Sequence, residues 1–217
     1  GVNEIWPRLV APVFGFGCLI ITSLLGRRLY PGTQVYFLAP LLLVGCFYWG
    51  IYSTLTMFDL ILTFWSLVGI YGLILVWGGK LFRGWILFGC AIGLGILSKG
   101  PVVLIFLLPS ALFGPYWAKS QNGSIWLKWY IGLMMAVLLG TIIALTWAML
   151  AGQAGGDAYK EALFWGQSAG RIVQSFAHKK PFWWYLVILP GLLLPWVVWP
   201  TMLKSIWRLI REYLSTD

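Results

Sequence analysis

The amino-acid sequence predicts an all-α, polytopic transmembrane helical bundle, and three observations support this class. Sixty per cent of the 217 residues are hydrophobic and only 10% are charged. The mean hydropathy is +0.86, far above that expected of a soluble globular domain. The apolar residues also form long continuous runs, whereas half-buried strands would alternate polar and apolar residues. These features exclude an ordinary soluble domain.

Seven apolar runs are candidates to cross a hydrocarbon core of about 30 Å, which takes roughly 17 to 25 helical residues. They are Trp6–Leu25, Val35–Tyr52, Asp59–Trp77, Gly84–Leu97, Val102–Trp117, Trp126–Leu150 and Phe182–Thr201. The fourth run is short, so its helix is either tilted or joined to the fifth run through Lys99-Gly100-Pro101. Six or eight spans therefore stay open beside the count of about seven.

Positive charge is concentrated in alternate connections between these runs. Cytoplasmic loops carry an excess of Lys and Arg, so these connections are expected to face the cytoplasm. The residues concerned are Arg27, Arg28, Lys80, Arg83, Lys119, Lys128, Lys204, Arg208 and Arg211. The opposite face then receives Asp59, Lys99 and the loop Gly152–Pro181. The net charge of +9 thus reflects mainly membrane topology, and no nucleic-acid partner is expected.

Asp59 is the only acidic residue between Glu4 and Asp157, and it stands at the start of a predicted span. A carboxylate beside lipid is costly, so such a residue usually has a function and a cationic partner. Asp59 can also simply cap the N-terminus of its helix, where the helix dipole favours negative charge. Its position alone leaves both roles open.

Lys99 precedes Gly100 and Pro101, which are expected to end one helix and to start the next. An ammonium group beside free backbone N–H groups at the membrane surface suits an anionic headgroup such as a phosphate. The alternative role for Lys99 is that of a lysine whose long side chain reaches from a helix end into water, which is common.

The loop Gly152–Pro181 is longer than a minimal connection, as functional loops often are. Arg171 offers the planar fork that binds a phosphate or a carboxylate through two parallel hydrogen bonds. Lys179 can assist Arg171 or can bind an anionic lipid surface. His178 is open to three interpretations: a solvated loop residue, a general acid or base, or a metal ligand together with Glu4.

Small residues inside the predicted spans are expected to serve packing. The cysteines show no spacing typical of a redox motif or a metal site, so they are expected to pack as small hydrophobic residues. They are Cys18, Cys46 and Cys90. Gly89 and Gly93, followed by Gly95, give one helix a flat strip that a neighbouring backbone can approach closely.

Four segments, in the order in which they occur, resemble the polyprenyl-phosphate-sugar-dependent glycosyltransferases of the protein mannosyltransferase and aminoarabinose transferase superfamily. They are Gly1–Leu9, Phe58-Asp59 at the start of a span, Gly93–Pro101, and the stretch from Phe164-Trp165 through Gly170-Arg171 and His178-Lys179-Lys180 to Leu186. The resemblance extends over nearly the whole chain, although each motif is only moderately specific. It implies a GT-C fold with the active site on the extracytoplasmic face of the bacterial inner membrane.

The resemblance also implies a reaction, in which a sugar moves from a polyprenyl phosphate to a lipid or protein acceptor by an inverting displacement. Lys99 and Arg171 would hold the donor phosphate with support from Lys179, and Asp59 would position the donor sugar or the acceptor. Donors of the aminoarabinose, mannose, glucose and galactose types all stay open, as do lipid A, another glycolipid or a protein as acceptor. Glu4 and His178 are possible contacts of the acceptor or of a divalent metal, but they would make an incomplete site by themselves.

The chain departs from the family pattern in one respect. The principal catalytic aspartate of the family lies in the first extracytoplasmic loop, whereas this sequence begins with Gly1 at or beyond the end of that loop. Residues 1–217 are therefore expected to be part of a single transmembrane glycosyltransferase domain, without its first helix, its first loop and its C-terminal part. The fragment alone is expected to be inactive.

Two other classes of function compete with an enzyme. A transporter or flippase of lipid-linked sugars would show broken helices, internal repeats and charges in the middle of spans. No convincing repeat is visible, and the candidate residues lie at one membrane surface. A non-enzymatic scaffold would leave all the charges on this surface solvated or bound to lipid headgroups, and it would tolerate Asp59→Asn and Lys99→Ala.

Overall fold

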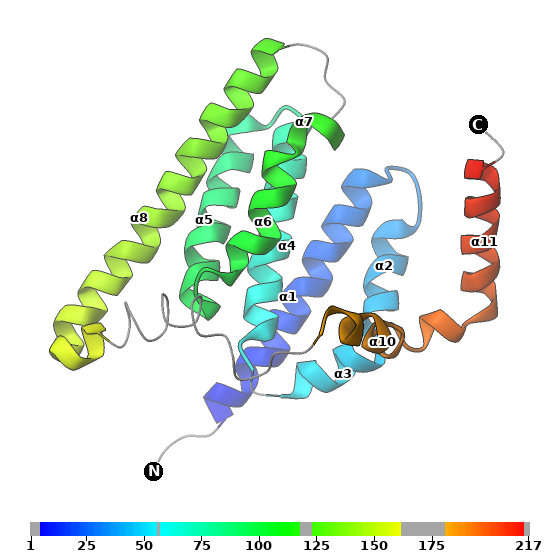
Figure 1. Ribbon diagram of the computed structural model, residues 1–217, viewed down its shortest axis with the longest axis horizontal. Coiled ribbons are helices and arrows are strands. Elements are labelled where there is room, and N and C mark those ends of the chain that lie inside the picture. Colours follow the sequence, from blue (N-terminus) through cyan, green and yellow to red (C-terminus); the bar gives the residue numbers. More distant parts are fainter. Residues whose placement is uncertain (1–4, 56, 118–122, 162–180, 215–217) are drawn as a thin grey trace.

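The computed structural model describes residues 5–55, 57–117, 123–161 and 181–214, and every regular element in these ranges is helical (Figure 1). The elements are α1 (Ile5–Leu29), α2 (Val35–Val44), α3 (Phe47–Thr54), α4 (Asp59–Trp77), α5 (Leu81–Lys99), α6 (Val102–Leu112), α7 (Gly114–Trp117), α8 (Gly123–Glu161), α10 (Phe182–Leu192), η3 (Trp196–Val198) and α11 (Pro200–Leu214). The predicted all-α membrane class is confirmed.

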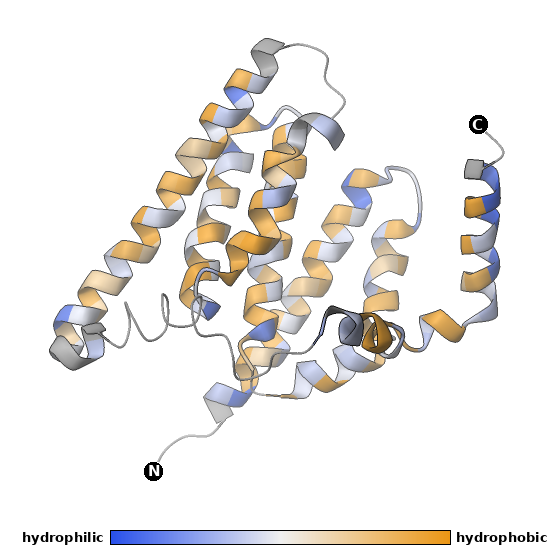
Figure 2. Cartoon of the chain, in the orientation of Figure 1, coloured by the Kyte–Doolittle hydropathy of each residue, from blue (hydrophilic) through white to orange (hydrophobic). Residues whose placement is uncertain are grey.

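Fewer full-length spans are present in the described residues than the seven predicted from the sequence. Four helices are long and apolar enough to cross a membrane, namely Pro7–Leu29 within α1, α4, α5, and Trp126–Gly156 within α8. A fifth span is possible if α2 and α3, which meet at an angle of 69°, together form one broken span. Figure 2 shows the apolar character of the long helices. The fourth predicted run is not short, since α5 has 19 residues.

Two predicted spans, Val102–Trp117 and Phe182–Thr201, are interrupted. Each contains a proline inside its first helix, Pro109 in α6 and Pro190 in α10. Both helices end within three residues of this proline. The proline alone does not end a helix in this chain, since α1 continues to Leu29 beyond Pro12. Mean hydropathy does not detect the end of a helix inside an apolar run. The prediction that each of these two runs forms one full-length span is therefore wrong.

The break between α2 and α3 lies against the break between α10 and η3, although the two are far apart in the sequence. The backbone N–H of Phe47 donates to the Leu194 carbonyl oxygen at 3.0 Å. The Trp196 indole N–H donates to the Leu42 carbonyl oxygen at 2.9 Å. A broken helix within a membrane must find partners for its backbone groups, and each break here supplies partners to the other.

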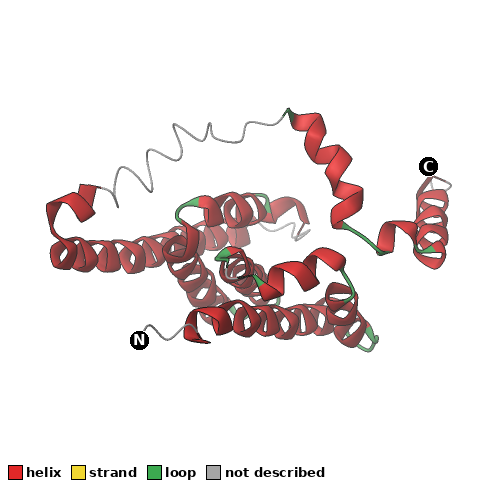
Figure 3. Ribbon diagram, turned by 90° about the horizontal axis from the view of Figure 1, so that it is seen from below, coloured by secondary structure: helices red, strands yellow, loops and turns green. Residues whose placement is uncertain are grey.

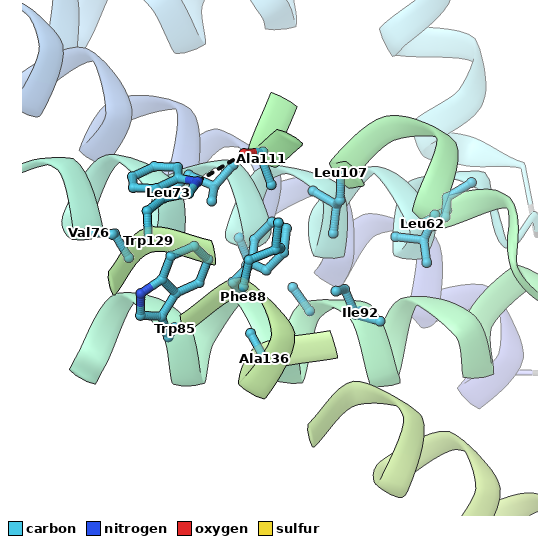
Figure 4. Packing of buried hydrophobic residues seen from close by; sticks show 14 residues of the cluster. Leu62, Leu73, Val76, Trp85, Phe88, Ile92, Leu107, Ala111, Trp129 and Ala136 are labelled. Carbon is cyan, nitrogen blue, oxygen red and sulfur yellow. Dashed lines mark hydrogen bonds between the residues drawn. The ribbon is translucent and has the colours of Figure 1, made fainter. Parts of the chain in front are cut away.

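The core lies between α4, α5, α6 and α8, with α1 packed against α4 and α2 packed against α1 (Figure 1). The largest fully buried hydrophobic side chains include Leu73, Phe88, Ile92 and Leu107 (Figure 4). Trp129 of α8 reaches into the same cluster, where its indole N–H donates to the Ala111 carbonyl oxygen at 3.0 Å. One continuous core therefore joins these four helices.

The glycine strip on α5 packs as the sequence predicts. A Cβ atom on Gly89 would lie 2.7 Å from the Ala136 carbonyl oxygen of α8, and one on Gly93 would lie 3.0 Å from that of Gly140. Gly95 faces α6 instead, because a Cβ there would lie 2.6 Å from a methyl group of Val103. Side chains at these positions would push the neighbouring helices away from α5.

Cys18 follows the prediction that the cysteines serve packing, whereas Cys46 and Cys90 are only half-buried. All three are free, and Cys18 is fully buried. The Cys18 thiol donates a long hydrogen bond of 3.8 Å to the Leu60 carbonyl oxygen in the first turn of α4. Within the described residues, no group of three or more His, Cys, Asp or Glu side chains could hold a metal ion.

Candidate functional site

Charged residues in the described spans are confined to the ends of the helices. The C-terminus of α1, the turn between α4 and α5, and the start of α8 lie at one end of the bundle (Figure 1). That end carries Arg27, Arg28, Lys80, Arg83 and Lys128. The start of α4 and the end of α5 lie at the opposite end and carry Asp59 and Lys99. This separation matches the predicted charge pattern, and the cytoplasmic assignment of the basic end stays a prediction.

Asp59 and Lys99 form an ion pair at this second end of the bundle. The Lys99 Nζ donates to Asp59 Oδ1 at 2.5 Å, across 40 positions of sequence. The Asp59 side chain is 42% exposed and the Lys99 side chain is 38% exposed, so solvent or a ligand can reach both. The pair therefore joins two neighbouring antiparallel helices at an accessible surface.

Each member of the pair stands where the helix dipole favours its charge. Asp59 is the first residue of α4, at the positive end of that helix, and Lys99 is the last residue of α5, at the negative end of its helix. The N-cap residue of α4 is Phe58, which makes no side-chain capping hydrogen bond. Asp59 therefore stabilises its helix through the helix dipole. It is not the N-cap residue, which is one of the two roles that its position in the sequence left open.

Hydroxyl groups bond to backbone carbonyl oxygens at the two helix ends that carry the pair. The Thr63 hydroxyl donates to the Asp59 carbonyl oxygen at 2.8 Å, and the Ser98 hydroxyl donates to the Gly95 carbonyl oxygen at 2.6 Å. These bonds add to the regular helical ladder next to both charged residues.

The chain turns immediately after Lys99. Gly100 has φ +75° and ψ −161°, a conformation that side-chain-bearing residues rarely adopt, and its N–H donates to the Ile96 carbonyl oxygen at 2.7 Å. Pro101 follows as the N-cap residue of α6. The sequence prediction that Gly100 and Pro101 end one helix and start the next is confirmed, and the turn fixes Lys99 at the end of the bundle.

The remaining predicted site residues lie outside the residues that the structure describes. They are Glu4, Arg171, His178 and Lys179. The grouping of Lys99 with Arg171 and Lys179 around a donor phosphate, and the pairing of Glu4 with His178, therefore stay predictions. Of the six candidates, the structure brings together Asp59 and Lys99.

Sequence reasoning placed Asp59 and Lys99 on the same membrane face but did not pair them. It predicted that Lys99 binds the donor phosphate and that Asp59 positions the donor sugar or the acceptor. The signal for pairing was available, because the two runs that carry them are successive and antiparallel, which brings the start of one beside the end of the other. Thr63 and Ser98 were not singled out, since hydroxyl groups that bond to a carbonyl oxygen of the preceding turn are common in helices.

Comparison with known proteins gives relatives but no family or structural match. No family model matches the chain, and no solved structure matches it. The chain is 31% identical to the undecaprenyl phosphate-alpha-4-amino-4-deoxy-L-arabinose arabinosyl transferase of Edwardsiella ictaluri, over 89% of the chain and 36% of that protein. It is 30% identical to the protein of the same name from Pseudomonas aeruginosa, over 98% of the chain and 39% of that protein.

A third relative is the undecaprenyl phosphate-alpha-4-amino-4-deoxy-L-arabinose arabinosyl transferase 1 of Pseudomonas fluorescens, which is 29% identical over 91% of the chain. The chain spans 36% of that protein as well. It thus covers well under half the length of each of these three relatives. Over most of its own length, this helical membrane chain is similar to bacterial enzymes named for arabinosyl transfer from undecaprenyl phosphate.

Proposed function

We propose that this chain is part of a membrane glycosyltransferase that moves a sugar from a polyprenyl-phosphate donor to an acceptor on the extracytoplasmic face. The observation that carries the proposal is the similarity to arabinosyl transferases over 89% to 98% of the chain. Residues 1–217 then form part of a single transmembrane catalytic domain. In this arrangement the end of the bundle that holds Asp59 and Lys99 faces the periplasm of a bacterial inner membrane.

The donor follows from the relatives. Their names specify undecaprenyl phosphate and 4-amino-4-deoxy-L-arabinose, and we take this lipid-linked pentose as the donor of the present protein. We propose a lipid of the lipid A type as the acceptor, with a protein acceptor as the alternative.

The distribution of charge supports an enzyme at a membrane surface over a transporter. A transporter or flippase of lipid-linked sugars would hold its cargo near the middle of the membrane, at polar or charged groups in broken helices. In the described spans α1, α4 and α5, charged residues lie only near the helix ends. The exposed Asp59–Lys99 pair occupies a surface position, where the phosphate of a lipid-linked donor would lie.

Lys99 has a defined role in this proposal. During transfer, an oxygen of the acceptor bonds to the anomeric carbon, and the bond from that carbon to the phosphate oxygen breaks. Negative charge grows on the departing lipid phosphate, and a nearby ammonium group stabilises it. Lys99 supplies that group, and Arg171 and Lys179 are proposed as its further cationic partners. Glu4 and His178 are proposed as contacts of the acceptor or of a metal.

Asp59 acts on the site through Lys99. Without donor, the carboxylate holds the ammonium at the surface and neutralises it. When the donor binds, its phosphate competes with Asp59 for Lys99, and the released carboxylate is free to accept a hydrogen bond from the donor sugar or the acceptor. With the donor bound, Lys99 faces two negative groups, the phosphate and the Asp59 carboxylate, and Arg171 and Lys179 are proposed to balance the second of them.

The test is sugar transfer by the complete natural protein in liposomes, with a labelled undecaprenyl-phosphate aminoarabinose donor. Lys99→Ala is expected to lower the transfer rate by about 100-fold or more, as the loss of a charge-stabilising group does in other enzymes. Asp59→Asn is also expected to lower the rate, because it removes the carboxylate that positions the donor sugar or the acceptor. Lys80→Ala is the matched control, because Lys80 lies at the opposite end of the bundle. Unchanged transfer in both site variants would overturn the assignment of the site, and absence of transfer by the unaltered protein with every sugar tested would overturn the function.

A further inference from the structure

Helix α11 (Pro200–Leu214) has two faces of opposite character. With about 100° between successive residues of an α-helix, Lys204, Arg208 and Arg211 lie within an arc of about 60°. Apolar residues occupy the opposite side, and Figure 2 shows both characters along the helix. The apolar residues are Leu203, Ile206, Trp207, Leu209 and Ile210, each of them between 47% and 66% exposed. This is the pattern of a helix that lies at a boundary between water and an apolar phase.

The apolar face of α11 has little protein covering it. Among the described elements, its main contact is with η3, the short helix directly before it. Figures 1 and 3 agree that α11 stands apart from the bundle. The extended backbone of Trp199 joins α11 to η3.

A membrane-spanning role does not explain α11. It is not among the helices that are long and apolar enough to cross a membrane. Three cations within eight residues would be costly in hydrocarbon, whereas at a surface they attract anionic lipid headgroups. Trp207 is a side chain that favours the level of the headgroups. The charge of the polar face therefore indicates that α11 lies at a membrane surface and that this surface carries anionic headgroups.

We propose that α11 binds the surface of an anionic lipid bilayer and lies in the plane of that surface. Its apolar arc enters the boundary between headgroups and acyl chains, and Lys204, Arg208 and Arg211 contact anionic headgroups. The helix turns at Trp199 and Pro200 from the direction seen in Figure 1, along the bundle axis, into the membrane plane. In this position, α11 anchors the end of the α10–η3 segment to the membrane surface. The same segment forms hydrogen bonds with the backbone at the break between α2 and α3.

The test places a spin label at one residue of each face. Thr201→Cys, which lies next to the cationic arc, reports the polar face and Ile206→Cys the apolar face, each in the full chain with its three native cysteines replaced by alanine. The chain is reconstituted in phosphatidylcholine vesicles with and without phosphatidylglycerol. With phosphatidylglycerol, the label at Ile206→Cys should be accessible to dissolved oxygen and shielded from a water-soluble nickel chelate. The label at Thr201→Cys should show the reverse.

Charge is tested separately. The triple variant Lys204→Gln, Arg208→Gln, Arg211→Gln should weaken partitioning of the helix to the anionic surface by about fivefold for each cation removed. High salt should weaken the same partitioning in the chain with its cations intact. This second measurement tests the role of charge even if the triple variant fails to fold. The double variant Lys80→Gln, Arg83→Gln removes cations from the basic end of the bundle and should leave the labels of α11 unchanged.

Three outcomes would overturn the proposal. Labels on both faces could be open to the nickel chelate, which would show a solvated helix. The label at Ile206→Cys could be shielded from both reagents whether or not phosphatidylglycerol is present, which would show that α11 packs against protein. Loss of that shielding on dilution of the chain in the vesicles would identify the covering protein as a second copy.

Discussion

Lys99 donates to Asp59 across the ends of two antiparallel helices, with 2.5 Å between Nζ and Oδ1. The bond joins the end of α5 to the start of α4, and the dipole of each helix favours the charge at its terminus. This ion pair is partly exposed, so its contribution to stability is small, about 0 to 1 kcal/mol. The proposed role of Lys99 in binding the donor phosphate does not depend on this small contribution to stability.

Reversal of the pair separates the proposed binding role from the contribution to stability. The double variant Asp59→Lys, Lys99→Asp keeps an ion pair but exchanges its charges, and it places each charge at the helix end that disfavours it. We expect a loss of about 1 to 2 kcal/mol in the free energy of unfolding from the dipoles, and a fold that persists. Sugar transfer by the complete protein should be lost, because the phosphate would meet a carboxylate at position 99. Thermal unfolding in detergent and a transfer assay measure the two effects, and retained transfer would contradict the phosphate role of Lys99.

A substitution at Gly100 tests in a second way whether the position of Lys99 matters for sugar transfer. The φ of +75° at Gly100 makes Gly100→Ala strained, at a cost of about 1 to 3 kcal/mol. Relief of that strain would move the end of α5, so we expect sugar transfer to fall together with stability. Gly79→Ala is the matched control, since Gly79 has φ +83° at the opposite end of the bundle. It should lower the unfolding temperature by a similar amount while the folded protein keeps its transfer rate. Equal effects of both variants on transfer would show that Gly100 matters only for stability.

The sequence predicted the helical membrane class and the bounds of one helix, Asp59–Trp77, because long apolar runs with few charges have few alternatives. It also predicted the glycine strip on α5, because only small side chains allow two backbones to approach closely. It overcounted the spans at α6 and α10, where Pro109 and Pro190 precede the helix ends. Hydropathy measures transfer into lipid and is insensitive to hydrogen-bond geometry.

The site was predicted only in part, for a different reason. The sequence identified Asp59 and Lys99 as unusual, since charges near membrane spans are rare. It could not give their distance, because that depends on how closely α4 and α5 pack. Gly72 and Gly84 set this packing, and a Cβ atom on Gly72 would lie 2.8 Å from the Gly84 carbonyl oxygen. These glycines carry no chemical signal of the contact that they permit.

The contact between Gly72 and Gly84 gives a third prediction. In Gly84→Ala, the new methyl group would lie 2.6 Å from the Gly72 carbonyl oxygen, so α4 and α5 must separate. We expect a loss of about 1 to 3 kcal/mol in the free energy of unfolding, as for other overpacked sites. Gly50→Ala in α3 is the control, because nothing lies within 4 Å of its Cβ position. Unfolding in detergent should distinguish the two, and equal stability would contradict close packing of the helices.

The hydrogen bond from Trp129 to Ala111 gives a fourth prediction. Trp129 is 4% exposed, and it joins α8 to α6 inside the core (Figure 4). Trp129→Phe removes the indole donor and part of the ring, with an expected loss of about 2 to 3 kcal/mol. Trp117→Phe removes a similar bond to the Ser110 carbonyl oxygen from an exposed position and should cost less. Comparison of the two unfolding temperatures is the measurement, and a larger effect at Trp117 would contradict the core position of Trp129.

The fifth prediction concerns the 217-residue chain by itself. It covers 36% to 39% of the length of its three compared relatives, and none of the described residues is proposed as the base for the acceptor. We therefore expect the isolated chain in liposomes to bind the undecaprenyl-phosphate donor through Lys99 but not to transfer its sugar. Donor binding that falls with Lys99→Ala, measured by co-sedimentation of labelled lipid, would confirm that the isolated chain retains its site. Sugar transfer by the isolated chain would contradict the prediction and would show that these residues hold the complete catalytic machinery.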